Sequence, residues 1–120
     1  MNPETRACVA YVALRIVSGR QASAVYDYSR SGYTSIDGQV SASNVDLYDY
    51  SRSAHFGGSG GGGQYSLYDY GRSHHVDLKV NGNQYEGYCY GSSCHFSGQV
   101  NGTSTSLYDY GSGGHFDYSL

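Results

Sequence analysis

Hydrophobic and polar positions divide the chain into a short N-terminal segment and a long repetitive one. Over residues 3–18 apolar side chains occupy nearly every helical face, interrupted mainly by Arg6 and Arg15. Asn2 followed by Pro3 is typical of the start of a helix. Because a helix that is apolar all round has to be buried, we predict a helix over residues 3–18 that is packed on the rest of the fold or caps it.

From residue 25 onward the sequence repeats one unit: Tyr-Asp-Tyr, a small-residue turn, then His and an aromatic or aliphatic residue. A fixed period of this length is the signature of repeated supersecondary units. Both tyrosine columns are complete, whereas Cys89 interrupts the Asp column and Tyr33 the His column. The whole chain, residues 1–120, is expected to form a single domain. Its five β-repeats over residues 25–120 begin at Val25, Leu47, Leu67, Gly87 and Leu107.

Each copy contains two short runs of alternating apolar and polar residues, which predict two β-strands. Asn81-Gly82 and Asn101-Gly102 favour two-residue type I′ hairpin turns. The prediction is therefore a mainly β fold, an antiparallel meander of about ten strands that is curled or folded over the N-terminal helix. The equal length of the copies also permits a β-solenoid with one coil per copy. The glycine run at 57–63 keeps the repeat phase and is interpreted as a floppy or closely approached turn.

The turns also predict how the strands pair. A tight turn in the small-residue segment of the fourth copy pairs Tyr88 with His95 and Cys89 with Cys94. A two-residue Asn-Gly turn after the next strand pairs His95 with Tyr108 as well. Alternation then places the tyrosines and histidines on one face of the sheet and the Leu, Phe and Val residues on the other.

The Asp column is expected at the rim of the apolar face, beside the turns. In three copies an arginine follows the aspartate by three residues, and we expect these pairs to be exposed and to add little stability. The pairs are Asp27/Arg30, Asp49/Arg52 and Asp69/Arg72.

Composition narrows the functional classes. Fifteen tyrosines and a net charge of −3 favour a folded domain, with tyrosine supplying much of the buried area, over a disordered chain. This charge offers no basic surface for nucleic acid. The apolar run at 7–14 is too short to span a membrane. We expect a cytoplasmic protein; the alternative is export, because residues 22–24 look like a signal-peptide cleavage site.

The cysteines leave two interpretations open. Cys89 and Cys94 lie close enough in the predicted register for a disulfide, but in a reducing compartment they would serve as small apolar fillers. A zinc site needs four ligands, and no second Cys/His pair accompanies Cys94-His95. We predict no metal, no cofactor and no enzymatic activity, because no P-loop, dinucleotide-binding glycine pattern or nucleophile elbow is present.

The recurring Tyr/His columns are interpreted either as structural cross-strand pairs or as an aromatic binding platform. Both faces of the predicted sheet carry apolar or aromatic columns, and its edge strands are unpaired. These features favour a scaffold that associates with itself into oligomers or filaments. The alternative is a module that binds carbohydrate or a surface through the platform. Its candidate residues are Tyr48, Tyr68, Tyr88, Tyr108, His55, His75, His95 and His115.

The stretch CVAYVALRIVSGRQASAVYDYSRS and the Tyr-Asp-Tyr…His-Phe copies after it resemble short bacterial repeat proteins with the same pattern. The resemblance covers essentially the whole chain and implies no particular activity. More distantly, the Tyr- and Gly-rich hairpins are similar to the choline- and glucan-binding repeats of bacterial surface proteins. Those repeats depend on tryptophan, of which this chain has none.

Overall fold

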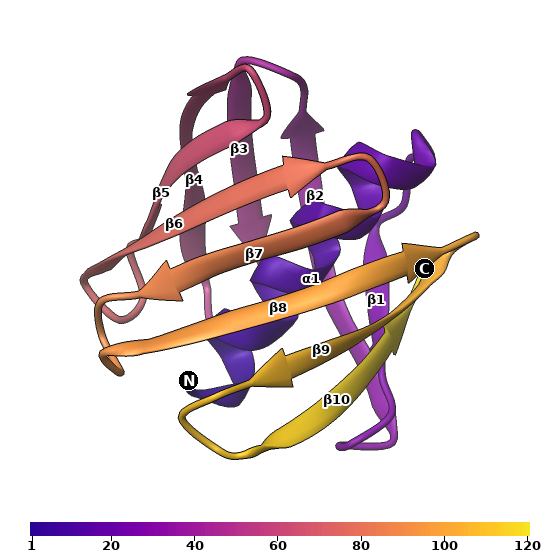
Figure 1. Ribbon diagram of the computed structural model, residues 1–120, viewed down its shortest axis with the longest axis vertical. Helices are drawn as coiled ribbons and strands as arrows, with labels where there is room; N and C mark the ends of the chain where they lie inside the picture. The colour runs from indigo at the N-terminus through magenta and orange to yellow at the C-terminus, as the bar shows by residue number, and fades with distance from the viewer.

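The computed structural model describes residues 1–120 as one helix and ten β-strands (Figure 1). Asn2 begins the helix, its side chain accepting a hydrogen bond from the Thr5 backbone N–H at 2.9 Å. Gly19 ends it in the left-handed conformation, with φ of 70°. The elements are α1 (Pro3–Ser18), β1 (Ala24–Asp27), β2 (Gly32–Val40), β3 (Asn44–Asp49), β4 (Ala54–Gly61), β5 (Gln64–Asp69), β6 (His74–Asn81), β7 (Gln84–Cys89), β8 (Cys94–Asn101), β9 (Ser104–Asp109) and β10 (Gly114–Ser119).

The ten strands form a closed antiparallel barrel. Each strand pairs with its neighbours in the chain, and β1 also pairs with β10 through Tyr26–Ser119 and Asp27–Tyr118. The predictions of a mainly β fold and a hairpin meander are confirmed. The solenoid alternative is wrong, because every connection reverses the chain and neighbouring strands are antiparallel. Closure leaves the sheet without an unpaired edge strand.

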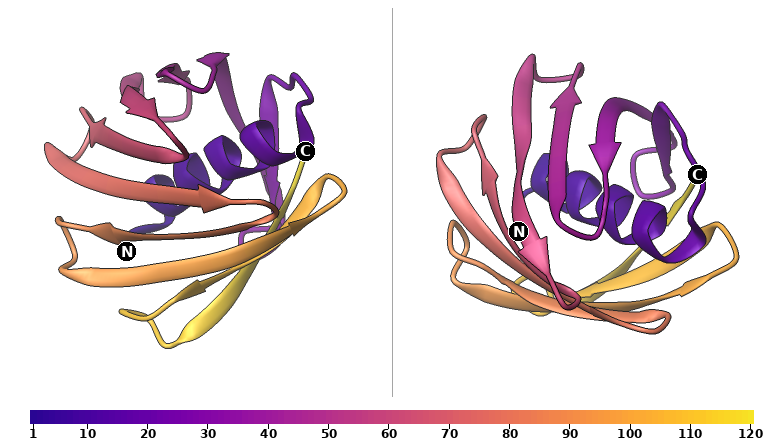
Figure 2. Two further views of the ribbon diagram at one scale, coloured as in Figure 1. Left: turned by 45° about the horizontal axis from the view of Figure 1, so that its top comes forward. Right: turned by 90° about the horizontal axis from the view of Figure 1, so that it is seen from above.

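The helix lies inside this barrel, so the meander does fold over it as expected, but it encloses the helix completely, which goes beyond a helix that packs on the repeats or caps them. Figure 2 shows α1 crossing the interior with strands around it. Every residue of α1 from Thr5 to Arg15 is buried. A helix that is apolar on all faces needs cover on all faces, and a closed sheet provides it. The inward side chains that surround it include Val25, Ile36, Leu47, Phe56, Leu67, Val76, Phe96 and Leu107, each at most 1% exposed.

The register within the Tyr-His hairpins is the predicted one: Tyr88 pairs with His95 and Cys89 with Cys94. Four residues, 90–93, form the connecting loop. The predicted register of the Asn-Gly hairpin is wrong, because Asn101 pairs with Ser104 and leaves Gly102-Thr103 as the two-residue turn. Only Gly102 has a positive φ there, 62°, as a type II′ turn requires.

Barrel closure explains this shift of register. Gly87 pairs with Phe96 on the next strand, and Phe96 pairs with Asp109 on the strand after it. Gly87 and Asp109 thus lie in the same row across the sheet although they are 22 residues apart, two more than the repeat period of 20. The predicted pairing would have placed residues 20 apart in the same row, so adjacent copies would have had no stagger. A barrel closes only when its strands tilt and their register is staggered. Since the shift is two residues and not one, the inward and outward faces are unchanged.

The glycine run at 57–63 is mostly strand rather than turn. β4 continues to Gly61, and only Gly62 and Gly63, with φ of 61° and 81°, form the turn. A Cβ atom on Gly57 or Gly58 would collide with a backbone oxygen of a neighbouring strand. These glycines therefore permit a close approach of backbones, as glycine kinks do where a sheet bends.

The prediction that the Asp/Arg pairs are exposed is wrong for the carboxylates. Asp27, Asp49, Asp69 and Asp109 are all 0% exposed. They point inward at the rim that surrounds the start of α1, because they share the inward face with the Leu column. Arg52 donates from Nε to Asp49 and from Nη1 to Asp69, both at 2.8 Å. The predicted third pair is also replaced, since Arg72 contacts Glu4 at 3.7 Å.

The helix supplies further donors to this rim. Thr5 Oγ1 donates to Asp69 Oδ2 at 2.6 Å, and Arg6 Nη1 lies 3.3 Å from Asp109 Oδ2. Burial alone would raise the pKa of Asp69, but the hydrogen bonds from Arg52 and Thr5 outweigh it and lower that pKa. The rim is thus a set of paired, buried charges that fixes α1 in the barrel. The helix has neither the length nor the apolar character to cross a membrane.

Candidate functional site

The outward face of each copy carries a compact aromatic cluster. In the fourth copy the ring centroid of Tyr88 lies 4.9 Å from that of Tyr90 and 4.8 Å from that of His95, both in edge-on arrangements. The Tyr110 backbone N–H donates to the His95 carbonyl, so the backbone groups of His95 point toward β9. The Tyr88–His95 pair therefore lacks direct backbone hydrogen bonds, and in such pairs side chains stand closest.

The same geometry recurs around the barrel. The centroid separations in the other copies are 4.7–4.9 Å, with Tyr33 taking the place of His in the first copy. The predicted pairing of His95 with Tyr108 is wrong, because His95 lies opposite Tyr110, and every close ring pair lies within a single copy. The platform is instead a set of separate clusters, each ending in a tyrosine that is 49–62% exposed: Tyr28, Tyr50, Tyr70, Tyr90 and Tyr110.

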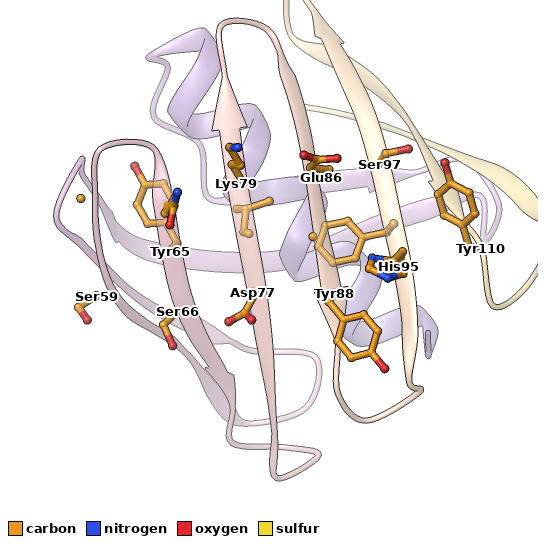
Figure 3. Close-up of a pocket in the computed structure, with 15 residues that line it drawn as sticks. Ser59, Tyr65, Ser66, Asp77, Lys79, Glu86, Tyr88, His95, Ser97 and Tyr110 are labelled. Carbon is orange, nitrogen blue, oxygen red and sulfur yellow. The ribbon is translucent and has the colours of Figure 1, made fainter.

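A groove of about 950 Å³ crosses the outer surface of the barrel from β4 to β8 (Figure 3). Its polar lining includes Asp77, Lys79 and Glu86, and its aromatic lining includes Tyr88 and His95. Asp77 and Tyr88 are half-buried although their side chains belong to the outward face. We name this hollow the main groove. The remaining residues that line it are Ser59, Gly61, Gln64, Tyr65, Ser66, Leu78, Gly87, Phe96, Ser97 and Tyr110.

The floor of the main groove contains a departure from the repeat. Gly87 occupies the column filled by Leu47, Leu67 and Leu107 in other copies. A Cβ atom at Gly87 would collide with the ring of Phe96 and with the Asp77 carbonyl oxygen. The absent side chain thus lets Phe96 sit under β7 and form part of the floor.

Among the polar groups of the groove, Asp77 is oriented by a hydrogen bond. Tyr90 Oη donates to Asp77 Oδ2 at 2.7 Å, which raises the pKa of the Tyr90 phenol because the hydrogen bond and the negative charge of Asp77 favour the protonated form. Lys79 pairs with Glu86 across β6 and β7. Direct cross-strand neighbours of opposite charge compensate each other. The groove therefore offers oriented hydrogen-bonding groups without an excess of positive charge.

A second hollow of about 550 Å³ adjoins the first and shares Lys79, Glu86 and Ser97 with it. It adds Tyr108 and His115 to the lining. We name it the side groove. The two grooves adjoin at these three residues and together extend around the barrel from β4 to β10, and we call the pair the trough.

The structure separates the sequence-predicted platform residues into groups. Tyr88 and His95 line the main groove, and Tyr108 and His115 line the side groove. Another hollow, of about 270 Å³, is lined by Tyr48 and His55 together with Asp37 and Asp46. The last pair of the platform lies in neither groove: Tyr68 and His75.

Sequence reasoning missed Asp77, Lys79 and Glu86 as site residues. For Lys79 and Glu86 a signal exists in the repeat itself, whereas Asp77 has Asp37 and Asp117 at equivalent positions. Lys79 and Glu86 replace Gln or Ser and Asp or Ser at the equivalent positions of other copies, and Gly87 replaces Leu. Departures from the repeat thus gather at the residues that line the main groove.

Cys8, Cys89 and Cys94 are all buried free thiols. No group of three or more His, Cys, Asp or Glu side chains is arranged to hold a metal ion. No protein-family model matches the chain, and the comparisons with curated proteins and with solved structures find no match either.

Proposed function

We propose that this protein is a non-enzymatic binding module that holds a neutral glycan chain in the trough on its outer face. The observation that carries the proposal is the main groove, where aromatic side chains adjoin fixed hydrogen-bonding groups. A sugar ring presents apolar C–H faces, which pack on aromatic rings, and hydroxyl groups, which bond to carboxylates and amines. Binding sites commonly combine such apolar surface with a few placed polar groups.

The shape of the trough favours an oligosaccharide over a single sugar. The main and side grooves adjoin, so a linear ligand long enough to pass over Lys79, Glu86 and Ser97 would contact both. Aromatic clusters recur along this path, Tyr88 with His95 and then Tyr108 with His115, and each offers a further ring for a sugar to pack on. A chain of sugars repeats its faces in the same way.

The charges favour a neutral ligand. Lys79 faces Glu86, and Asp77 adds a second carboxylate that is held by Tyr90. A polyanionic polysaccharide would meet more negative than positive charge in the main groove at neutral pH. Like charges in proximity cost binding energy, so acidic glycans should be rejected.

Self-association, the function first expected, is the second candidate. It was expected because of unpaired strand edges and two uncovered faces. The closed barrel has no unpaired edge, and α1 covers its inner face. A different observation still favours it: exposed tyrosine rings on every copy, the most exposed being Tyr33 at 74%. Aromatic residues are enriched at protein interfaces.

A matched pair of variants tests glycan binding. After a glycan array has identified a ligand, calorimetry would compare Tyr88→Ala, in the main groove, with Tyr68→Ala, which removes the same aromatic contacts outside both grooves. Loss of one sugar–aromatic contact worth about 1.4 kcal/mol weakens binding about tenfold. We expect that loss for Tyr88→Ala only.

Two outcomes would contradict the proposal. An array without any bound glycan would remove its basis, and equal losses in the two variants would place the ligand elsewhere. Sedimentation velocity over a range of protein concentrations separates the second candidate. A concentration-dependent increase in mass would support self-association, and a constant monomer would exclude it.

A further inference from the structure

The fourth copy lacks a structural feature that the other four share. In those copies the rim aspartate accepts backbone hydrogen bonds from the loop that follows it and so holds the loop closed. Asp69 Oδ1 accepts from the N–H groups of Gly71 and Arg72, both at 3.0 Å. Asp27 and Asp109 also accept from two loop N–H groups each, and Asp49 accepts from that of Ser51. Cys89 occupies this position in the fourth copy, and a thiol is a poor substitute for a carboxylate as an acceptor.

A second cysteine stands directly across from the first. Cys94 pairs with Cys89 at the rung that closes the hairpin, and both side chains are buried on the inward face. The backbone of His95 points toward β9, so that of Cys94 points toward β7. Residues paired in this way have Cα atoms about 5.5 Å apart, inside the range that a disulfide bridges.

Cys94 is the more accessible thiol. It is 9% exposed, against 1% for Cys89 and 0% for Cys8. Cys94 Sγ lies 3.0 Å from Ser92 Oγ and 3.6 Å from Asp109 Oδ1, at the open rim of the barrel. Cys8 lies on α1 in the interior, where burial raises the pKa of its thiol, so it serves as an unreactive internal reference.

We propose that Cys89 and Cys94 form a reversible disulfide clasp that replaces the missing aspartate and closes the 90–93 loop. Formation proceeds by exchange with a low-molecular-weight disulfide such as oxidised glutathione. Cys94, as its thiolate, attacks one sulfur of that disulfide, a mixed disulfide forms, and one thiol leaves. Cys89 then attacks the Cys94 sulfur and releases the second thiol. The two cysteines lose two electrons and two protons, and the small disulfide becomes two thiols.

The clasp lies next to the main groove but does not depend on its proposed ligand. The adjacent rung is the Tyr88–His95 pair, and the loop that the clasp would close carries Tyr90, whose hydroxyl fixes Asp77. Oxidation would therefore hold one wall of the groove in place. Its effects on mass and stability are measurable in the absence of any glycan.

The sequence makes the reaction simple to follow. Trypsin cuts after Lys and Arg, and none follows Lys79, so residues 80–120 form one peptide that holds both Cys89 and Cys94. Cys8 falls in a separate peptide, residues 7–15. After treatment of the folded full chain with oxidised glutathione, we expect the 80–120 peptide to lose two hydrogen atoms and the Cys8 peptide to keep its free thiol.

The structural role has its own readout. Oxidation should raise Tm by roughly 5 °C and slow hydrogen exchange of the loop amides about tenfold. The variant Cys89→Asp with Cys94→Gly reproduces the fifth copy, Asp109 and Gly114, and should show slow loop exchange without oxidation. Cys89→Ser with Cys94→Ser should exchange rapidly in both buffers.

Three results would overturn the clasp. The first is an 80–120 peptide that keeps both thiols at every glutathione ratio. The second is a stable glutathione adduct on Cys94 in place of the internal bond. The third is a disulfide that forms but changes neither Tm nor loop exchange, because the bond would then have no closing role.

Discussion

Replacing Gly87 with Ala tests whether packing in the structure requires glycine at this position, where the other copies carry larger side chains. By strand propensity alone Ala is better than Gly, by about 0.5–1 kcal/mol. In the structure a Cβ atom at Gly87 meets the Phe96 ring and the Asp77 carbonyl oxygen at distances that real contacts do not allow. Relief requires movement of both the ring and a backbone strand. Overpacking of this kind costs about 1–3 kcal/mol.

Subtracting the propensity gain from the cost of the clash, we expect Gly87→Ala to lower the free energy of unfolding by about 0–2.5 kcal/mol. Gly61→Ala is the matched control, since Gly61 lies in β4 with no atom within 4 Å of an added Cβ. That control should gain about 0.5 kcal/mol. Urea unfolding followed by circular dichroism measures both. A Gly87→Ala protein as stable as the Gly61→Ala protein would refute the packing argument.

Two further predictions concern the buried rim. Arg52→Met should lower the free energy of unfolding by about 3–5 kcal/mol, because it leaves the Asp49 and Asp69 carboxylates buried without their shared cation. Arg72→Met removes an exposed contact and should lower it by less than about 0.5 kcal/mol. Equal urea midpoints for the two variants would contradict this. Burial would raise the pKa values of Asp27, Asp69 and Asp109, but hydrogen bonds and ion pairs outweigh it and lower them. The stability that these ionised carboxylates add to the fold is therefore fully present above the unfolded Asp pKa of about 3.9. It is lost as the pH falls through the lower pKa values of the folded state. Unfolding free energies measured from pH 6 to about pH 2 should fall steeply below pH 4, and a flat profile there would exclude the pairing.

The sequence could predict what depends on local periodicity. Alternation fixed which side chains share a face, and the Asn2-Pro3 start and Gly19 end delimit α1. The Tyr88–His95 register followed from a loop inside one copy. These features are set within about twenty residues of chain, so a single repeat contains the information.

The predictions that were wrong concern features that depend on closure of the whole sheet. Neither the stagger of two residues per copy nor the complete enclosure of α1 is encoded in any one repeat, since both follow from joining β1 to β10. The Asp column was misjudged for the same reason. An aspartate at the end of a strand is exposed on an open sheet, but on a barrel around a helix it meets Thr5, Arg6 and Arg52.

Repetition also limits where a specific site can arise. Five near-identical copies around a barrel give five similar aromatic clusters, and equal clusters cannot by themselves select one ligand position. Selection needs broken symmetry, and departures from the repeat in the third and fourth copies supply it: Lys79 and Glu86 in the third copy place opposite charges across the groove, whereas Gly87 in the fourth opens the floor and Cys89 changes the loop beside it. The grouping of these departures at the trough supports the proposal that the trough binds a ligand.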